Sequence, residues 1–155
     1  MAFEWLFSVA NLSILPDDVL ALPSRGTINF HDGPLPRHAG LNAPMWALLA
    51  GERSHGISWH LVEGGVDEGD VLAQRTFELG ERDTSVVVNT RCYEVAIESF
   101  AGLVGDLARG TEVRTKQDLS QRTYHGRYDR PEAMCTVDWS WPASRIAALV
   151  RALAF

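Results

Sequence analysis

Residues 27–40 read TINFHDGPLPRHAG, a short apolar run that passes abruptly into a loop dense in glycine and proline. Apolar and β-branched runs of this kind, bounded by turn-forming residues, are typical of buried strands, so residues 27–31 are predicted to form one. A similar run, residues 3–10 (FEWLFSVA), predicts an earlier strand. The connection between the two contains a short helix from Pro16 and has the length of a parallel crossover. The pattern therefore predicts an α/β fold with a mostly parallel sheet.

Further elements alternate along the rest of the chain. The predicted elements are a helix that begins at Asn42 or Ala43 and ends before Gly51, strands over 56–63 and 71–79, a helix capped by Asp83 that runs to Arg109 with Gly110 after it, and a helix from Pro142 onward. The long helix has an expected core-facing stripe of Ala96, Phe100, Leu103, Val104 and Leu107, and the last helix one of Ile146, Leu149, Val150 and Leu153. Nothing is predicted to cover this last stripe. Residues 111–134 are polar without a sustained period, which indicates a linker or an extended arm.

Composition excludes several classes of protein. The chain has 155 residues, a net charge of -6 and 46% hydrophobic residues, which excludes intrinsic disorder. No apolar stretch approaches the roughly 20 residues of a membrane helix, and the apolar start lacks the basic residues of a secretory signal. The two cysteines cannot form a disulfide framework, which fits a reducing compartment. We therefore expect a cytoplasmic protein without a membrane partner, and the acidic balance disfavours a broad nucleic-acid footprint.

The end of the predicted strand 27–31 carries two polar residues that can do chemistry. Asn29 and His31 are two positions apart, so their side chains point to the same face, and Phe30 points to the other. Sites in open α/β sheets lie beyond the carboxyl ends of the strands. The pair could cap the strand end and satisfy loop backbone, or it could supply an amide donor and a titratable imidazole to a substrate.

A second candidate is the loop at residues 63–70, EGGVDEGD. It could be a hairpin turn with solvated acids, or its glycines could let the backbone approach a ligand and hold a carboxylate in place. Its acid spacing does not match a calcium loop. Sets of possible metal ligands at His31, Asp32 and His38, or at His55 and His60, lack zinc-type spacing, so no metal is expected. Nucleophile and phosphate-loop motifs are also absent from the sequence.

Four segments together resemble the folate-dependent formyltransferases, the family of the methionyl-tRNA, phosphoribosylglycinamide and sugar-amine enzymes. The segments are ILP at 14–16, INFHDGPLPRHAGLNAPMWALLAGE at 28–52, HGISWHLVEGGVDEGDVLAQ at 55–74 and DWSWPASRIAALVRAL at 138–153. The resemblance covers nearly the whole chain. It implies a Rossmann-like scaffold and formyl transfer from 10-formyltetrahydrofolate to an amine acceptor.

The resemblance also implies which residues act. Asn29, His31 and Asp67 would be the catalytic trio: Asn29 and a protonated His31 would donate to the formyl oxygen, and Asp67 would favour the imidazolium and take the proton of the amine. The pterin pocket would be lined by the backbone around Leu12, Ser13, Ile14, Leu15, Gly64, Gly65 and Val66.

The chain also departs from the family pattern. Asp32 and Gly33 follow the catalytic histidine where many members have other residues, a form similar to formyltransferase-like domains of nonribosomal peptide synthetases. The expected organisation is the C-terminal half of a catalytic domain at 1–112, a linker at 113–136 and the start of a truncated C-terminal domain at 137–155, without the N-terminal βα units. The expected acceptor is a small amine, an amino sugar or a carrier-bound amino acid, in a chain that could belong to a multidomain synthetase. Methionyl-tRNA ranks lower, and the rival functions are donor hydrolysis and a non-catalytic folate-binding or docking module.

Overall fold

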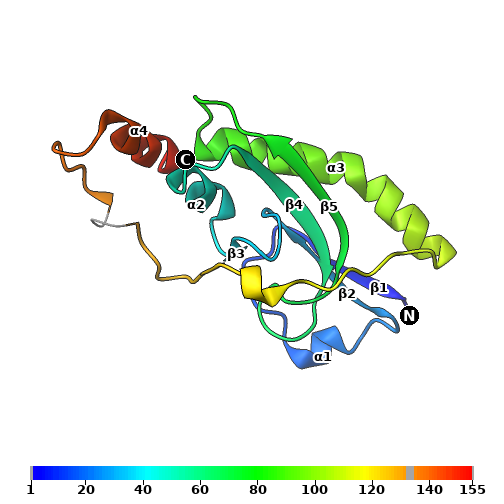
Figure 1. Ribbon diagram of the computed structural model, residues 1–155. Helices are drawn as coiled ribbons and strands as arrows, with labels where there is room; N and C mark the ends of the chain where they lie inside the picture. Colours follow the sequence, from blue (N-terminus) through cyan, green and yellow to red (C-terminus); the bar gives the residue numbers. More distant parts are fainter. Residues whose placement is uncertain (1, 132–134, 155) are drawn as a thin grey trace.

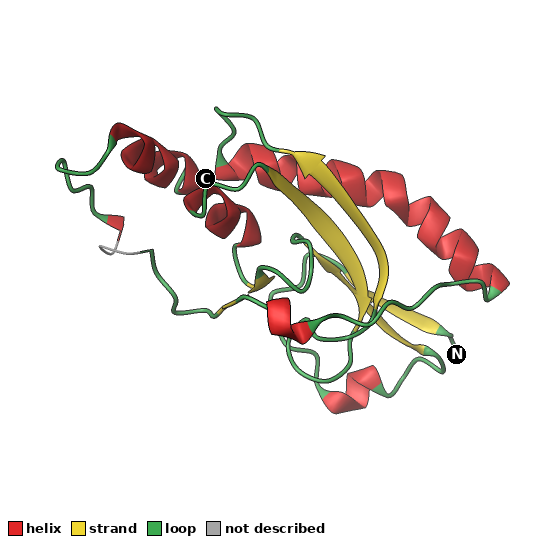
Figure 2. Cartoon of the chain, viewed as in Figure 1, coloured by secondary structure: helices red, strands yellow, loops and turns green. Residues whose placement is uncertain are grey.

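The computed structural model describes residues 2–131 and 135–154, which form the elements drawn in Figures 1 and 2. In chain order these are β1 (Trp5–Ser8), α1 (Asp17–Leu20), β2 (Gly26–His31), β3 (Ala39–Gly40), α2 (Ala43–Leu49), β4 (Ser54–Leu61), β5 (Val71–Glu78), α3 (Ser85–Arg109), the 3-10 turn η1 (Leu119–Gln121), β6 (Tyr124–His125) and α4 (Ala143–Ala152). Each helix and strand expected from the sequence is present. Residues 132–134, which the predicted linker includes, lie outside the described part of the chain. No helix within the described residues is long and apolar enough to span a membrane.

The main sheet has four strands in the order β1-β2-β4-β5, and the α/β class is confirmed. β1 and β2 pair in parallel, as the predicted crossover requires. β4 is antiparallel to β2, and β5 is antiparallel to β4, so the sheet of this chain is mixed rather than mostly parallel. The reason is geometric. The chain passes through α2 beyond the carboxyl end of β2 and re-enters the sheet from that same end, where His31 pairs with Ser58.

The long helix α3 packs along the sheet and contributes much of the core (Figure 1). Its buried stripe is Ser85, Val88, Cys92, Ala96, Ser99, Leu103 and Leu107. Of the predicted stripe, Ala96, Leu103 and Leu107 are confirmed, whereas Phe100 and Val104 are 38% and 39% exposed. Phe100 still contacts Phe7 at a ring-centroid distance of 5.2 Å, so it lies at the edge of the core.

The start of α3 differs by one residue from the prediction. Thr84 is the N-cap, and its hydroxyl accepts a hydrogen bond from the Val87 N–H. Asp83 instead accepts from the Gly80 N–H and forms an ion pair with Arg91. Threonine and aspartate are both favourable N-cap residues. The ion pair with Arg91 holds the Asp83 side chain elsewhere, so Thr84 takes the N-cap position. Gly110 closes the helix in the left-handed conformation, with φ of 67°.

After α3 the chain forms an extended arm, residues 111–131, which lies against the body of the protein (Figure 2). Thr115 forms an antiparallel bridge with Val71, and β6 pairs in parallel with β3. The approach at β3 is close: a Cβ at Gly40 would lie 2.2 Å from the His125 carbonyl oxygen, and Gly40 has φ of 94°. Only glycine fits both conditions. The polar segment is therefore a docked arm.

The last helix, α4, packs against α2 and is not left uncovered as the sequence suggested. Leu149 and Ala152 are buried in this contact, and Ile146 and Leu153 are partly buried. Val150, predicted on the same stripe, is 57% exposed. Sequence periodicity locates the apolar face, but the partner comes from a segment about 100 residues earlier and could not be found by local pattern.

The α2–α4 contact gives a stability prediction. Leu149→Ala removes a side chain that is 4% exposed, so we expect the free energy of unfolding to fall by about 2–5 kcal/mol. Val150→Ala on the same helix removes a side chain that is 57% exposed and should change it by less than about 0.5 kcal/mol. Urea unfolding followed by circular dichroism measures both. Equal effects in the two variants would show that α4 does not dock on α2.

Candidate active site

The strand β2 places two polar side chains on one face, as its alternation predicts. Phe30 points to the opposite face, where its ring packs against Trp59 at a centroid distance of 5.3 Å. Asn29 and His31 therefore share the other face, and His31 is only 5% exposed. A buried imidazole needs partners for its ring nitrogens, and the loops around β2 supply them.

The ring of His31 has a fixed orientation. Its Nε2 lies 2.8 Å from the carbonyl oxygen of His38, and because a carbonyl only accepts, Nε2 carries a hydrogen and donates it. The other nitrogen, Nδ1, lies 3.5 Å from an Asp67 carboxylate oxygen and 3.9 Å from one of Asp32. Nδ1 is therefore the nitrogen that is left for proton exchange and for a substrate.

Asp67 reaches this place from the loop between β4 and β5. It has φ of 56°, a left-handed conformation that aspartate tolerates better than most residues, and Gly64, earlier in the same loop, has φ of 68°. Oδ2 accepts a hydrogen bond of 2.8 Å from the Gly40 N–H, and Oδ1 lies 3.3 Å from His60 Nε2. The structure thus brings the loop carboxylate to the strand-end pair, the arrangement that the second interpretation of the loop required.

The surroundings of Asp67 favour its ionised form. Burial raises the pKa of this carboxyl, but the hydrogen bond to His60, the charge of His31 and the hydrogen bond from the Gly40 N–H together outweigh burial and lower the pKa to about 2. The group is therefore a carboxylate at neutral pH, able to stabilise positive charge or to receive a proton.

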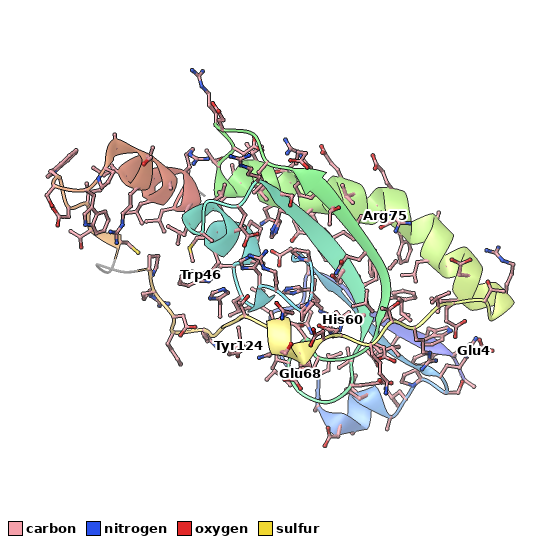
Figure 3. The ribbon with its side chains drawn as sticks, viewed as in Figure 1. Glu4, Trp46, His60, Glu68, Arg75 and Tyr124 are labelled. Carbon is pink, nitrogen blue, oxygen red and sulfur yellow. The ribbon has the colours of Figure 1, made fainter. Side chains whose placement is uncertain are left out.

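His60, which the sequence suggested only as a possible metal ligand, is a further residue of the site. It lies directly across from Asn29 in the β2–β4 pairing, and it is labelled in Figure 3. Its Nδ1–H donates to the Leu61 carbonyl oxygen at 2.8 Å, and its Nε2 lies 3.3 Å from both the Asn29 amide nitrogen and the Asp67 carboxylate. Unprotonated, Nε2 accepts from Asn29; protonated, it donates to Asp67. In the sequence, His60 lies on a predicted strand that ends just before the acidic loop. That position places His60 beside Asn29 only once the pairing register of the two strands is known.

The other residues weighed as metal ligands have other partners. Glu52 receives a hydrogen bond of 2.8 Å from His38 Nε2, and the Asp32 carbonyl oxygen receives one of the same length from His55 Nε2. Burial lowers the pKa of His55 to about 4, so its imidazole is neutral at neutral pH. Across residues 2–131 and 135–154 no group of three or more His, Cys, Asp or Glu could hold a metal ion.

Asp32, the departure from the family pattern, is part of the same cluster. Burial raises the pKa of its carboxyl above the ordinary value, against the opposing charge of His31 and a backbone hydrogen bond. Two carboxyls therefore face Nδ1 of His31, but their environments push their pKa values in opposite directions. Such a pair can divide acid and base roles.

The residues predicted to line a pterin pocket lie on two loops. Ser8, the last residue of β1, pairs with Asn29, so the loop that contains Leu12–Leu15 leaves the sheet directly beside β2. Leu12 and Ile14 are 87% and 86% exposed. Gly64, Gly65 and Val66 lead directly into Asp67, and Val66 is 42% exposed. Both loops offer exposed apolar side chains or open backbone close to Asn29 or Asp67.

The geometry defines a class of site. An amide, an imidazole and an ionised carboxylate converge at a strand end of an α/β sheet, which suits hydrogen bonding to a carbonyl oxygen together with proton removal. Residues 2–102 match the family model described as Formyl transferase. The chain belongs to the formyl transferase family.

Curated relatives are similar in sequence, and solved structures are similar in fold. The chain is 32% identical over 140 residues to a methionyl-tRNA formyltransferase from Caldanaerobacter subterraneus, covering 90% of this chain and 45% of that protein. It is 36% identical over 138 residues to one from Anaeromyxobacter dehalogenans, covering 89% and 44%. The fold is similar to an N-formyltransferase from Helicobacter canadensis solved with folinic acid and dTDP-3-aminofucose, with a TM-score of 0.83, 19% identity and coverage of 96% and 54%. It is also similar to HypX from Aquifex aeolicus in complex with tetrahydrofolic acid, with a TM-score of 0.81, 22% identity and coverage of 96% and 25%. The chain spans about half the length of the curated relatives that it matches.

The low pKa of Asp67 gives a pH prediction. Because its folded-state pKa of about 2 is below the ordinary value of 3.8, ionised Asp67 stabilises the fold above pH 4, and this contribution is lost as the pH falls from 4 to 2. The shift corresponds to about 2 kcal/mol. Between pH 4 and pH 2 the free energy of unfolding should therefore fall by about 2 kcal/mol more in the wild-type chain than in Asp67→Asn. Urea unfolding at each pH measures it. Parallel pH curves for the two proteins would contradict an ionised, stabilised Asp67.

Proposed function

We propose that this chain takes part in formyl transfer from 10-formyltetrahydrofolate to an amine acceptor, with Asn29, His31 and Asp67 as the catalytic residues. The observation that supports this most directly is the convergence of the Asp67 carboxylate on His31 Nδ1, at 3.5 Å, beside the Asn29 amide. Membership of the formyl transferase family and the curated relatives, which are methionyl-tRNA formyltransferases, support the reaction class.

The chemistry assigns a task to each residue. The folate donor supplies a formyl carbon that an amine can attack, with the folate nitrogen as leaving group. The Asn29 amide and His31 Nδ1 donate hydrogen bonds to the formyl oxygen as negative charge grows there, and one such donor is worth about 3 kcal/mol or more. Asp67 receives the proton that the amine loses, directly or through water. The leaving folate nitrogen must gain a proton: protonated His31 can give it, and the proton that Asp67 took from the amine then restores His31.

The donor is proposed to bind on the loops that contain Leu12–Leu15 and Gly64–Val66. The fit rests on two observations. The first loop leaves the sheet beside Asn29, and its exposed Leu12 and Ile14 offer apolar surface to a flat ring. The second loop leads straight to Asp67. A donor held between them would present its formyl group to the trio. No metal is proposed.

The acceptor is proposed to be a small amine, an amino sugar or a carrier-bound amino acid in the cytoplasm. Methionyl-tRNA is the second candidate, favoured by the 32% and 36% identity to methionyl-tRNA formyltransferases. Acidic groups offset positive charge on the arm, which argues against a tRNA acceptor: Arg122 is near Glu68 of the β4–β5 loop, and Arg114 is near Glu112. We also propose the division into a half catalytic domain at 1–112, a linking arm at 113–136 and the start of a further domain at 137–155, in a chain that could belong to a multidomain synthetase.

The first test is calorimetric titration of the chain with a stable formyltetrahydrofolate analogue. We expect micromolar binding that weakens at least tenfold in His31→Ala. Binding with formate release and no acceptor would indicate donor hydrolysis, and binding without any turnover would indicate a folate-binding module. A cooperatively folded chain with no detectable binding would contradict the proposed pocket.

The trio itself gives a sharper prediction. Asp67→Asn keeps the shape of the side chain and its tolerance of positive φ but cannot take a proton, so turnover should fall about 100-fold or more while the fold is retained. Asp129→Asn is a matched control, because Asp129 also accepts a backbone N–H, from Gly126 at 2.8 Å, but lies on an exposed part of the arm. The measurement is the rate of formyl transfer, monitored through the tetrahydrofolate that the reaction releases. Normal turnover in Asp67→Asn would remove Asp67 from the trio.

A further inference from the structure

The arm contacts both loops that carry the site. On one side, the Thr123 hydroxyl accepts a hydrogen bond of 2.7 Å from the His38 N–H, and the Thr123 carbonyl accepts one of 2.9 Å from Ala39. His38 in turn accepts the Nε2–H of His31. On the other side, Arg122 donates to the Val66 carbonyl oxygen at 2.8 Å. A segment that sequence patterning treats as a linker is therefore bonded to the surroundings of both His31 and Asp67.

Gln117 makes the most direct of these contacts. Its side-chain nitrogen donates to the carbonyl oxygens of Asp67, at 2.9 Å, and Gly69, at 2.7 Å. An amide nitrogen has two hydrogens, and here each has a carbonyl to accept it. Because both partners are carbonyl oxygens, the nitrogen of the Gln117 amide, and not its oxygen, must face them. A glutamate carboxylate at this position would be repelled by the same two oxygens.

The loop needs an external support of this kind. Asp67 is in the left-handed conformation, with φ of 56°. Two hydrogen bonds within the loop are long, from Glu68 N to the Gly65 carbonyl at 3.4 Å and from Gly65 N to the Glu68 side chain at 3.2 Å. Gly69 packs so tightly that a Cβ there would lie 1.9 Å from the Leu61 carbonyl oxygen. The peptide units around Asp67 are thus held from one side by β4 and from the other by Gln117.

We infer that Gln117 is a positioning residue for Asp67: its amide fixes the backbone on both sides of Glu68 so that the Asp67 carboxylate stays on the Gly40 N–H and faces His31. This inference rests on the proposed function in one respect: the position of Asp67 affects turnover only if Asp67 is catalytic. The geometric part can be tested without any turnover.

The test without turnover is amide hydrogen exchange at Gly40, whose N–H is bonded to Asp67 Oδ2. In Gln117→Glu and Gln117→Met, which keep the length of the side chain but lose both donors, we expect Gly40 to exchange about tenfold faster. Gln121→Glu is the matched control, since Gln121 lies on the same arm, is exposed, and its side chain bonds to Ser120. Gly40 exchange that stays at the wild-type rate in both Gln117 variants would overturn the inference.

A second measurement separates positioning from simple loss of stability. Gln117→Asn keeps the donors on a shorter side chain and should give an intermediate Gly40 exchange rate, and thermal unfolding of each variant identifies any that has lost its fold. In turnover, Gln117→Met should lower kcat about tenfold in the wild-type background and have no further effect in Asp67→Asn. An undiminished effect in Asp67→Asn would show that Gln117 does not act through Asp67. Faster Gly40 exchange in a chain that never transfers a formyl group would refute the proposed function and leave the positional role standing.

Discussion

The arrangement of this site depends on one carboxylate, that of Asp67, being held ionised inside the protein. An isolated buried carboxylate is costly, and the surrounding groups offset that cost: the Gly40 N–H bonds to one oxygen, and His60 and His31 face the two oxygens. These partners come from β3, β4 and β2, so the carboxylate draws three elements together. The left-handed backbone of Asp67 is one consequence, because the loop must turn sharply to deliver the side chain.

A second consequence concerns the extended arm. The loops that carry the site have little regular structure of their own, and loops of this kind need support from packed neighbours to hold a side chain to within a fraction of an ångström. The arm supplies this support through backbone pairing of β6 with β3 and through the side chains of Gln117 and Arg122. Residues outside the cluster of Asn29, His31 and Asp67 thereby help to hold the side chains of this cluster in place.

The two carboxyls around His31 show how environment assigns different properties to similar groups. Asp67 is surrounded by donors, whereas Asp32 is governed mainly by burial, and the pKa values of the two move in opposite directions. The loop acid has the lower pKa, which suits a group that stays charged in the resting site. Asp32 places a second carboxyl 3.9 Å from Nδ1 of His31, so this ring faces two acidic groups of different pKa.

The sequence by itself determined the elements, the α/β class and the sharing of one face by Asn29 and His31, because these follow from local periodicity and from turn residues such as Gly110. The resemblance to formyltransferases also predicted Asp67 as the acidic residue of the site. Tertiary structure alone decided the antiparallel entry of β4, the partner of α4 and the roles of His60 and Gln117. These depend on contacts between residues that are far apart in the sequence, such as His31 with Ser58 and Gln117 with Asp67, and a local pattern holds no information about which distant backbone will lie alongside.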